Sequence, residues 1–210
     1  MDGRDDDDGT TKEPSAASAA PAPDPSNWYA RALFERAYGW EPATLVCSPP
    51  HAVFLGGVDP FTETPVDVAP RAPTLVVSFG DPAHVELLRR SRSEWPDGVE
   101  WYAAEIFDHP SYASRFRALA LEAVETMERH RRSRRTSCIF VHCYMGISRS
   151  AAVVALFFMR VARMTLREAL TALRWCRPCV CPNVGFLSEL VALEIERGVG
   201  VPSDASKKAK

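Results

Sequence analysis

The 210-residue sequence has little lysine and no long hydrophobic run. Lysine supplies only four of its 25 basic residues, so arginine carries nearly all of the positive charge. The longest charge-free apolar run of the second half, Ser150–Met159, is far shorter than the roughly 20 residues that a transmembrane helix needs. The first residues are acidic, whereas a secretory signal begins with basic residues followed by an apolar stretch. We therefore expect a soluble intracellular protein, cytoplasmic or also nuclear, with neither a membrane nor a nucleic acid as partner.

The six cysteines do not form a metal-binding pattern. Cys176, Cys179 and Cys181 lie close together, but a structural zinc site needs about four ligands and no second half of such a site follows. In a reducing compartment the cysteines remain thiols. The sequence therefore predicts no metal and no disulfide framework.

Charge is distributed unevenly along the chain. Residues 1–26 carry seven acidic side chains against two basic ones, continue into an Ala/Pro/Ser-rich stretch and are predicted to be disordered. Residues 27–198 are predicted to form one folded domain. Residues 27–210 together are mildly basic, which suits an anionic substrate. Within the predicted domain, residues 27–40 read as a helix with a broad apolar face, which either packs on the domain or contacts a partner or a second copy. Residues 199–210 are predicted to be a flexible tail, and the oligomeric state stays open.

Strands and helices alternate over the rest of the domain, which predicts an α/β layered fold. Predicted strands cover residues 52–57, 74–80, 100–107 and 137–143, and predicted helices cover 111–130, 149–163, 165–176 and 184–198. The strand at 137–143 is apolar almost throughout, so we expect it to be buried on both faces in the middle of the sheet. Ser111 is the expected N-cap of its helix, and Thr165 with Glu168 has the spacing of a capping box.

The turn between the strand ending at Cys143 and the helix beginning near Arg149 has the composition of an anion-binding loop. Its five residues lie at the carboxyl end of a buried strand, where ligands of α/β sheets bind; they are Tyr144, Met145, Gly146, Ile147 and Ser148. Backbone N–H groups and the helix N-terminus supply partial positive charge there. Gly146 permits close backbone approach. Arg149 offers a planar fork for two phosphate oxygens.

The same positive field predicts a reactive cysteine. Cys143 should titrate below the usual thiol range and be a thiolate at neutral pH, which makes it a nucleophile directed at phosphorus. His142 is interpreted as an orienting residue rather than a base, because an ionised thiol needs no base. Ser150 can hydrogen-bond the sulfur and make it a better leaving group in a second step.

The segment HCYMGISRS resembles the signature loop of cysteine-dependent protein tyrosine phosphatases and is most similar to the dual-specificity branch. The stretch MTLREALTALRWCRPCVCPNVGFLSEL resembles the Arg-Pro turn, Pro-Asn and Gly-Phe of that branch, and AVFLGG resembles its opening strand. The resemblance covers about residues 45–197. It implies a central, mostly parallel sheet of about five strands flanked by helices. It also implies a phosphocysteine intermediate, with no metal or cofactor.

The resemblance further implies an aspartate that acts as general acid on the loop after the third strand. Asp108 fits, because it follows the predicted strand 100–107 and precedes Cys143 by 35 residues. Asp81 and Asp97 are rivals on neighbouring loops. An aspartate before proline is also common in ordinary turns, so the turn interpretation remains beside the catalytic one.

These residues together predict hydrolysis of phosphotyrosine, phosphoserine or phosphothreonine in a phosphoprotein substrate. The loop contains no lysine, which favours a protein over a phosphoinositide. Two alternatives remain: the same mechanism on a non-protein phosphate such as a lipid, an RNA 5′ end or a sugar, and a catalytically silent phosphate-binding module.

Two further features have more than one interpretation. The basic run at 129–137 is either a solvated turn, a docking patch, a nuclear-import signal or a phosphorylation site. Cys138 and Cys47 are candidate redox partners for an oxidised Cys143. Cys138 lies an odd number of residues from Cys143, so it should point to the other face of the sheet.

Overall fold

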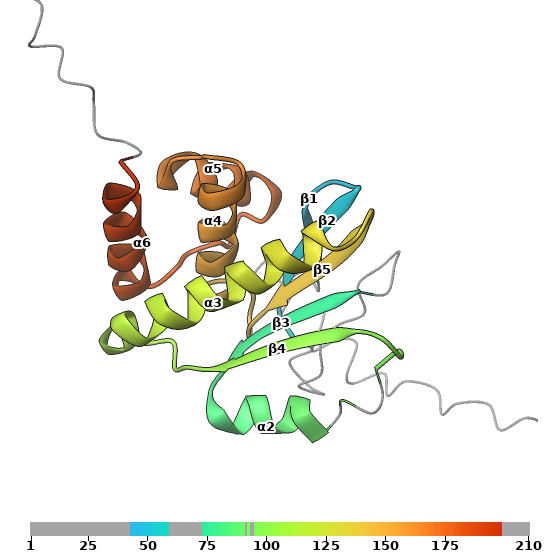
Figure 1. Ribbon diagram of the computed structural model, residues 1–210. Helices are drawn as coiled ribbons and strands as arrows, with labels where there is room; N and C mark the ends of the chain where they lie inside the picture. Colours follow the sequence, from blue (N-terminus) through green and yellow to red (C-terminus); the bar gives the residue numbers. More distant parts are fainter. Residues whose placement is uncertain (1–42, 59–72, 91, 93–94, 199–210) are drawn as a thin grey trace, which may run out of the picture.

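The computed structural model describes residues 43–58, 73–90, 92 and 95–198 (Figure 1). The helix predicted at 27–40 and both predicted tails lie outside the described residues. Five strands form one sheet with the order β1-β2-β5-β3-β4. Their bounds are β1 Ala43–Cys47, β2 His51–Gly56, β3 Leu75–Gly80, β4 Glu100–Glu105 and β5 Ser137–His142. Only β1 runs antiparallel to its neighbour, so the predicted mostly parallel α/β sheet is confirmed.

Strand β5 occupies the centre of the sheet because its sequence can be buried on both faces. All six of its residues are buried, and it pairs in parallel with β2 on one side and β3 on the other. In this register His142 lies beside both Gly56 and Ser78. The carboxyl ends of three parallel strands therefore meet where Cys143 begins the next loop.

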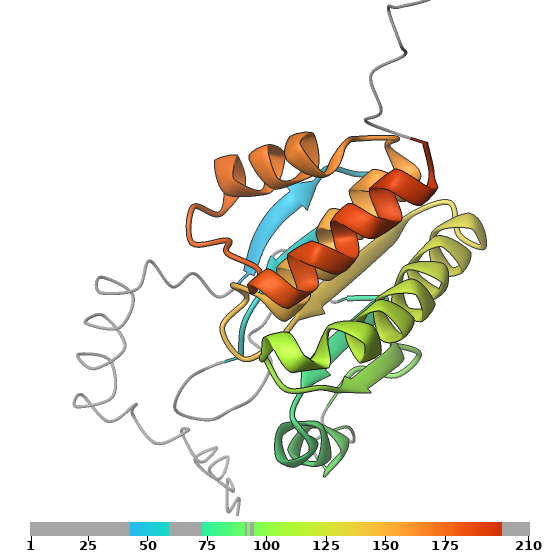
Figure 2. The ribbon, with the colours of Figure 1, turned by 90° about the vertical axis from the view of Figure 1, so that its left-hand side faces the viewer.

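The helices are α2 Pro82–Arg90, the short 3₁₀ helix η2 Pro110–Tyr112, α3 Ala113–Arg132, α4 Arg149–Val161, α5 Leu166–Cys176 and α6 Val184–Glu196. Helices α3, α4 and α6 lie on the same face of the sheet (Figures 1 and 2). Helix α4 contacts α3, α5, α6 and β5, which explains why its sequence is apolar nearly all round. This enclosure holds the N-terminus of α4, and with it Arg149, in a fixed position behind the loop.

Several local predictions need correction. Strand β1 and helix α2 were not predicted. The predicted strand 100–107 ends at Glu105, where β4 leaves the sheet edge. Ser111 is not a helix cap: the chain first forms η2, in which His109 accepts from the backbone N–H of Ser111, and α3 begins at Ala113 without a side-chain cap. The capping box of Thr165 and Glu168 is confirmed.

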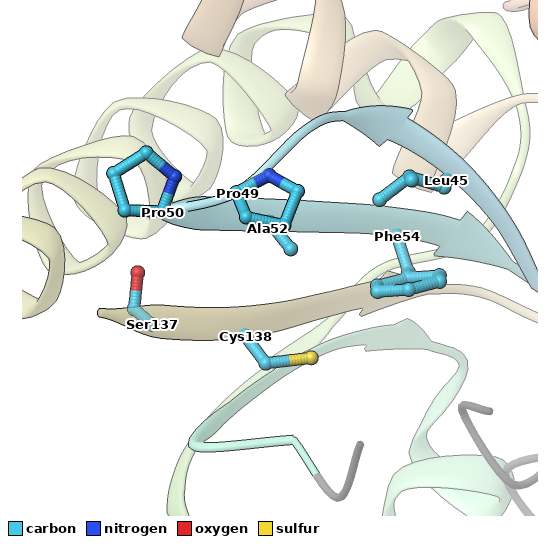
Figure 3. Close-up of a pocket in the computed structure, with 7 residues that line it drawn as sticks. All are labelled: Leu45, Pro49, Pro50, Ala52, Phe54, Ser137 and Cys138. Carbon is cyan, nitrogen blue, oxygen red and sulfur yellow. The ribbon is translucent and has the colours of Figure 1, made fainter. Parts of the chain in front are cut away.

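The second face of the sheet carries a smaller apolar cluster. Its buried members are Ala52, Phe54, Val76, Val99, Cys138 and Phe140, whereas Cys143 belongs to the larger core under the helices. The prediction that Cys138 and Cys143 point to opposite faces is therefore confirmed. Figure 3 shows a pocket on this second face, beside Cys138 and Phe54. It is lined by the first residues of β2 and β5 and so lies toward the amino ends of the strands, away from the loop after Cys143.

Candidate active site

The loop after Cys143 forms a cradle of backbone N–H groups because its carbonyl groups are bonded outward. The carbonyl of Tyr144 accepts from the N–H of Val58 at 3.1 Å, and that of Ile147 accepts from the N–H of Cys181 at 2.9 Å. Arg177 donates from Nη2 to the carbonyl of Met145 at 3.1 Å and from Nε to that of Gly146 at 3.0 Å. With these four consecutive carbonyls held outside, the N–H groups can face the centre, as in anion-binding nests.

Gly146 is required by this geometry. Its φ of +68° lies in the left-handed region. A Cβ at this position would lie 2.4 Å from the carbonyl carbon of Gly56, so no larger side chain fits. The loop thus lies directly against the end of β2. The close backbone approach predicted for Gly146 is thus made to Gly56, and it fixes the cradle to the sheet.

Cys143 lies at the bottom of the cradle with its sulfur surrounded by hydrogen-bond donors. The N–H of Gly146 reaches Sγ at 3.2 Å and Ser150 donates from Oγ to Sγ at 3.1 Å. Burial raises the pKa of the thiol, but the charge of Arg149 and the bonds from Ser150 and Gly146 outweigh it, so the pKa lies below its ordinary value. The arrangement therefore favours the thiolate, a nucleophile inside a site for an anion.

Arg149 begins α4 and lies beside Cys143 with 8% of its surface exposed. Its Nη1 donates to the carbonyl of Ile106 at 3.2 Å, and its Nε lies 4.0 Å from Oδ2 of Asp108. Among the described residues Nε has no hydrogen-bond partner. A buried guanidinium N–H without a partner is costly unless an anion can use it, so Arg149 is placed to bind phosphate oxygens.

His142 lies on the second face of the sheet and is fully buried. Its Nε2 is 2.7 Å from Oγ of Ser78, and this oxygen accepts the indole N–H of Trp101 at 2.8 Å. The hydrogen bond to Ser78 fixes the imidazole ring in place, and its direction depends on the tautomer of His142. Burial, followed by the proximity of His84, lowers the pKa of His142 to about 3. A neutral imidazole fixed in this way suits the predicted orienting role and cannot supply positive charge.

Asp108 lies over the cradle, where two donors reach the same oxygen. Ser148 donates from Oγ to Oδ1 at 2.7 Å, and Asn183 donates from Nδ2 to Oδ1 at 2.6 Å. The structure thus brings Asp108 to Ser148 and Arg149 of the loop although it is distant from them in sequence. Asp81 instead accepts the N–H of His84 at the start of α2, at 2.9 Å. Asp97 precedes β4 and so lies at the amino end of this strand, whereas Asp108 follows its carboxyl end.

Two residues of the site were not predicted as functional from sequence. Arg177 is 1% exposed and holds the cradle carbonyls, while Asn183 reaches Asp108. Both lie in the segment whose Arg-Pro and Pro-Asn pairs carried the family resemblance. The pairs were visible, but their partners lie 31 and 75 residues away, so sequence spacing could not indicate the contacts.

The remaining candidates lie away from the cradle. Cys47 ends β1 opposite Val53, toward the amino ends of the parallel strands, and Cys138 is on the other face, so neither is brought to Cys143. The basic run reaches the amino edge of β5, where Arg134 donates to Glu100 at 3.1 Å. Within the described ranges, no group of three or more His, Cys, Asp or Glu side chains could hold a metal, and no helix is long and apolar enough to cross a membrane.

Comparison with protein families gives one decisive match. The model of the dual specificity phosphatase catalytic domain matches residues 109–196, which include the cradle, Arg149, Arg177 and Asn183. Over these residues the chain carries a catalytic domain of the dual-specificity branch of the cysteine-dependent protein tyrosine phosphatases. The match begins one residue after Asp108, so the placement of this aspartate stands on geometry alone.

Curated relatives of this branch share part of the chain. Mouse dual specificity protein phosphatase 19 is 39% identical over 70 residues, 31% of this chain and 32% of the relative. Mouse dual specificity protein phosphatase 13B is 35% identical over 98 residues, 46% of each chain. The MAP kinase phosphatase with leucine-rich repeats protein 3 of Dictyostelium discoideum is 27% identical over 156 residues, 72% of this chain and 17% of that protein. The chain thus spans less than half the length of these relatives.

Solved structures share the phosphatase fold. Human DUSP28 has a TM-score of 0.54 at 24% identity, with 76% of this chain and 97% of that chain covered. The human tyrosine phosphatase-like serine/threonine/tyrosine-interacting protein has a TM-score of 0.53 at 19% identity, with 75% and 98% covered. At these identities the likeness supports the fold alone. The chain adopts the dual-specificity type of fold, a five-stranded sheet flanked by helices.

Proposed function

We propose that the chain is a protein phosphatase that hydrolyses phosphotyrosine, phosphoserine or phosphothreonine through a phosphocysteine intermediate. One observation supports this most: Cys143 Sγ lies at 3.1 Å and 3.2 Å from its donors in a loop whose carbonyls are bonded outward. A thiolate in such a cradle is aimed at an atom that carries several anionic oxygens, which is the description of a phosphate monoester.

In the first step, Cys143 attacks phosphorus, forming an S–P bond while the P–O bond to the leaving group breaks. The cradle N–H groups and Arg149 stabilise the charge on the three equatorial oxygens. Asp108 gives its proton to the leaving oxygen. In the second step a water attacks phosphorus and loses a proton to Asp108, and the S–P bond breaks. Inorganic phosphate leaves, and the bond from Ser150 stabilises the departing thiolate.

A phosphoprotein is the substrate that the loop favours. Apart from Arg149, no residue of the loop 143–149 is basic, so the cradle supplies little extra charge for a polyanion. A phosphoinositide or an RNA 5′ end carries additional phosphates close to the reacting one, whereas a phosphopeptide does not. Turnover of phosphopeptides should therefore exceed turnover of these two substrates by at least tenfold at equal concentration, and a reversed preference would contradict the assignment.

The role of Asp108 is tested by replacing it with asparagine, which keeps the shape and can still accept at Oδ1. We expect the rate on a phosphotyrosine peptide to fall by about 100-fold or more, because the leaving phenolate loses its proton donor. Asp97→Asn, at the amino end of β4, is the matched control and should leave the rate unchanged. If Asp108→Asn retained full activity while Asp97→Asn or Asp81→Asn lost it, the acid would be misassigned.

A further inference from the structure

Ser148, Asn183 and Asp108 form a closed set of hydrogen bonds between the phosphate loop, the N-terminus of α6 and the acid loop. Ser148 Oγ accepts the backbone N–H of Asn183 at 3.0 Å and lies 2.7 Å from Asp108 Oδ1. The Asn183 side chain reaches the same Oδ1 at 2.6 Å from Nδ2. Its Oδ1 accepts the backbone N–H of Phe186 at 3.1 Å, which caps α6.

The direction of every bond in this set follows from the backbone donors. Because Phe186 N–H can only donate, the acceptor end of the Asn183 amide faces the helix and its NH₂ group faces Asp108. A hydroxyl that already accepts from the Asn183 N–H has its single proton free for Asp108. Asp108 Oδ1 is therefore an acceptor from two directions, and it cannot also carry the proton that is given to a substrate.

We propose that Ser148 and Asn183 are positioning residues that confine the acidic proton of Asp108 to Oδ2. This oxygen is the one that lies near Arg149 Nε, at 4.0 Å, and therefore beside the phosphate that Arg149 is placed to bind. The inference rests on the proposed function, because it assumes that Asp108 protonates the leaving oxygen. It adds that the asparagine of the Pro-Asn pair acts on the chemistry through Asp108 as well as on the fold of α6.

The two roles of Asn183 can be separated by one substitution. Asn183→Ser retains a side-chain oxygen that caps α6, since serine is as good an N-cap as asparagine. Its shorter side chain cannot donate to Asp108. We expect kcat on a phosphotyrosine peptide to fall about 10- to 100-fold, with KM changed less than twofold, since the acid is misplaced but the phosphate cradle is intact.

Leaving-group dependence distinguishes this effect from a general structural loss. The leaving group of 2,4-dinitrophenyl phosphate is stable as an anion and needs no proton, so Asn183→Ser should hydrolyse it within about threefold of the unsubstituted chain. In an Asp108→Asn background, Asn183→Ser should cause no further fall on the peptide. Ser148→Ala, which removes the other donor, should show the same selective loss, so the test does not depend on one variant folding.

Thr165→Ala is the control, because it removes the N-cap of α5 without touching Asp108. It should lower stability and leave the ratio of the two substrate rates unchanged. The inference is overturned if Asn183→Ser slows both substrates equally, or if it leaves the peptide rate intact while Asp108→Asn lowers it. If Asp108→Asn itself leaves the peptide rate intact, the acid assignment in the proposed function fails and the inference fails with it.

Discussion

Arg177 should determine the shape of the phosphate cradle, although it touches no reacting atom. The residue is 1% exposed and donates to the carbonyls of Met145 and Gly146 and, at 3.1 Å from Nη1, to Oγ1 of Thr44. Arg177→Met keeps an unbranched apolar stem but leaves the two carbonyls without their donors. An unsatisfied buried acceptor costs about 1–3 kcal/mol, so the free energy of unfolding should fall by about 2–6 kcal/mol.

The same substitution should weaken anion binding, because a carbonyl freed from its donor can turn into the cradle and oppose the phosphate charge. We expect urea unfolding followed by tryptophan fluorescence to show the stability loss. Inhibition by inorganic phosphate should weaken at least tenfold, corresponding to about 1.4 kcal/mol. Arg174→Met is the matched control, since Arg174 donates to the carbonyl of Val180, at 3.0 Å, in the same segment but outside the cradle. Equal effects of the two variants, or unchanged phosphate inhibition in Arg177→Met, would refute the reasoning.

Two further substitutions test the loop itself. Ser150→Ala removes a hydrogen-bond donor that, with Arg149, outweighs the effect of burial and keeps the pKa of Cys143 low. The pKa of Cys143 should therefore rise, and both the pH dependence of alkylation by iodoacetamide and the acidic limb of kcat/KM should shift to higher pH. An unshifted profile would contradict the assignment. Gly146→Ala combines a positive φ with a Cβ clash, so it should lower the free energy of unfolding by about 2–4 kcal/mol and weaken phosphate binding. Gly198→Ala, at φ +65° in open space, should lower the free energy of unfolding by only about 1 kcal/mol. Equal losses of the two variants in urea melts would count against the cradle geometry.

Sequence reasoning worked where the chemistry is local. The apolar strand, the five-residue turn and the arginine at the helix start lie within 13 residues of one another, and each has a composition that few other structures explain. The capping box of Thr165 is likewise complete within four residues. For such segments the physical requirement and the sequence signal coincide, so fold class and cradle could be predicted together.

The missed features depend on distant contacts. Strand β1 pairs at the sheet edge and is only partly buried, so it lacks the continuous apolar run that reveals β5. Arg177 and Asn183 look like polar residues of an ordinary turn until the chain folds back on the cradle. Tertiary contacts, which single-sequence patterns do not encode, decided these cases. The N-cap predicted at Ser111 is an exception with a local cause, because Pro110 starts a 3₁₀ helix that contains Ser111.

The most direct test of the account is hydrolysis of a small aryl phosphate, without added metal, by the unsubstituted chain and by Cys143→Ser. We predict steady turnover by the first, none by the second, and retained phosphate affinity in the second, because serine keeps the cradle but is not ionised there. Turnover that persists in Cys143→Ser would contradict the cysteine mechanism. Absence of turnover in both, with phosphopeptide still bound, would mean that the cradle binds phosphate without hydrolysing it.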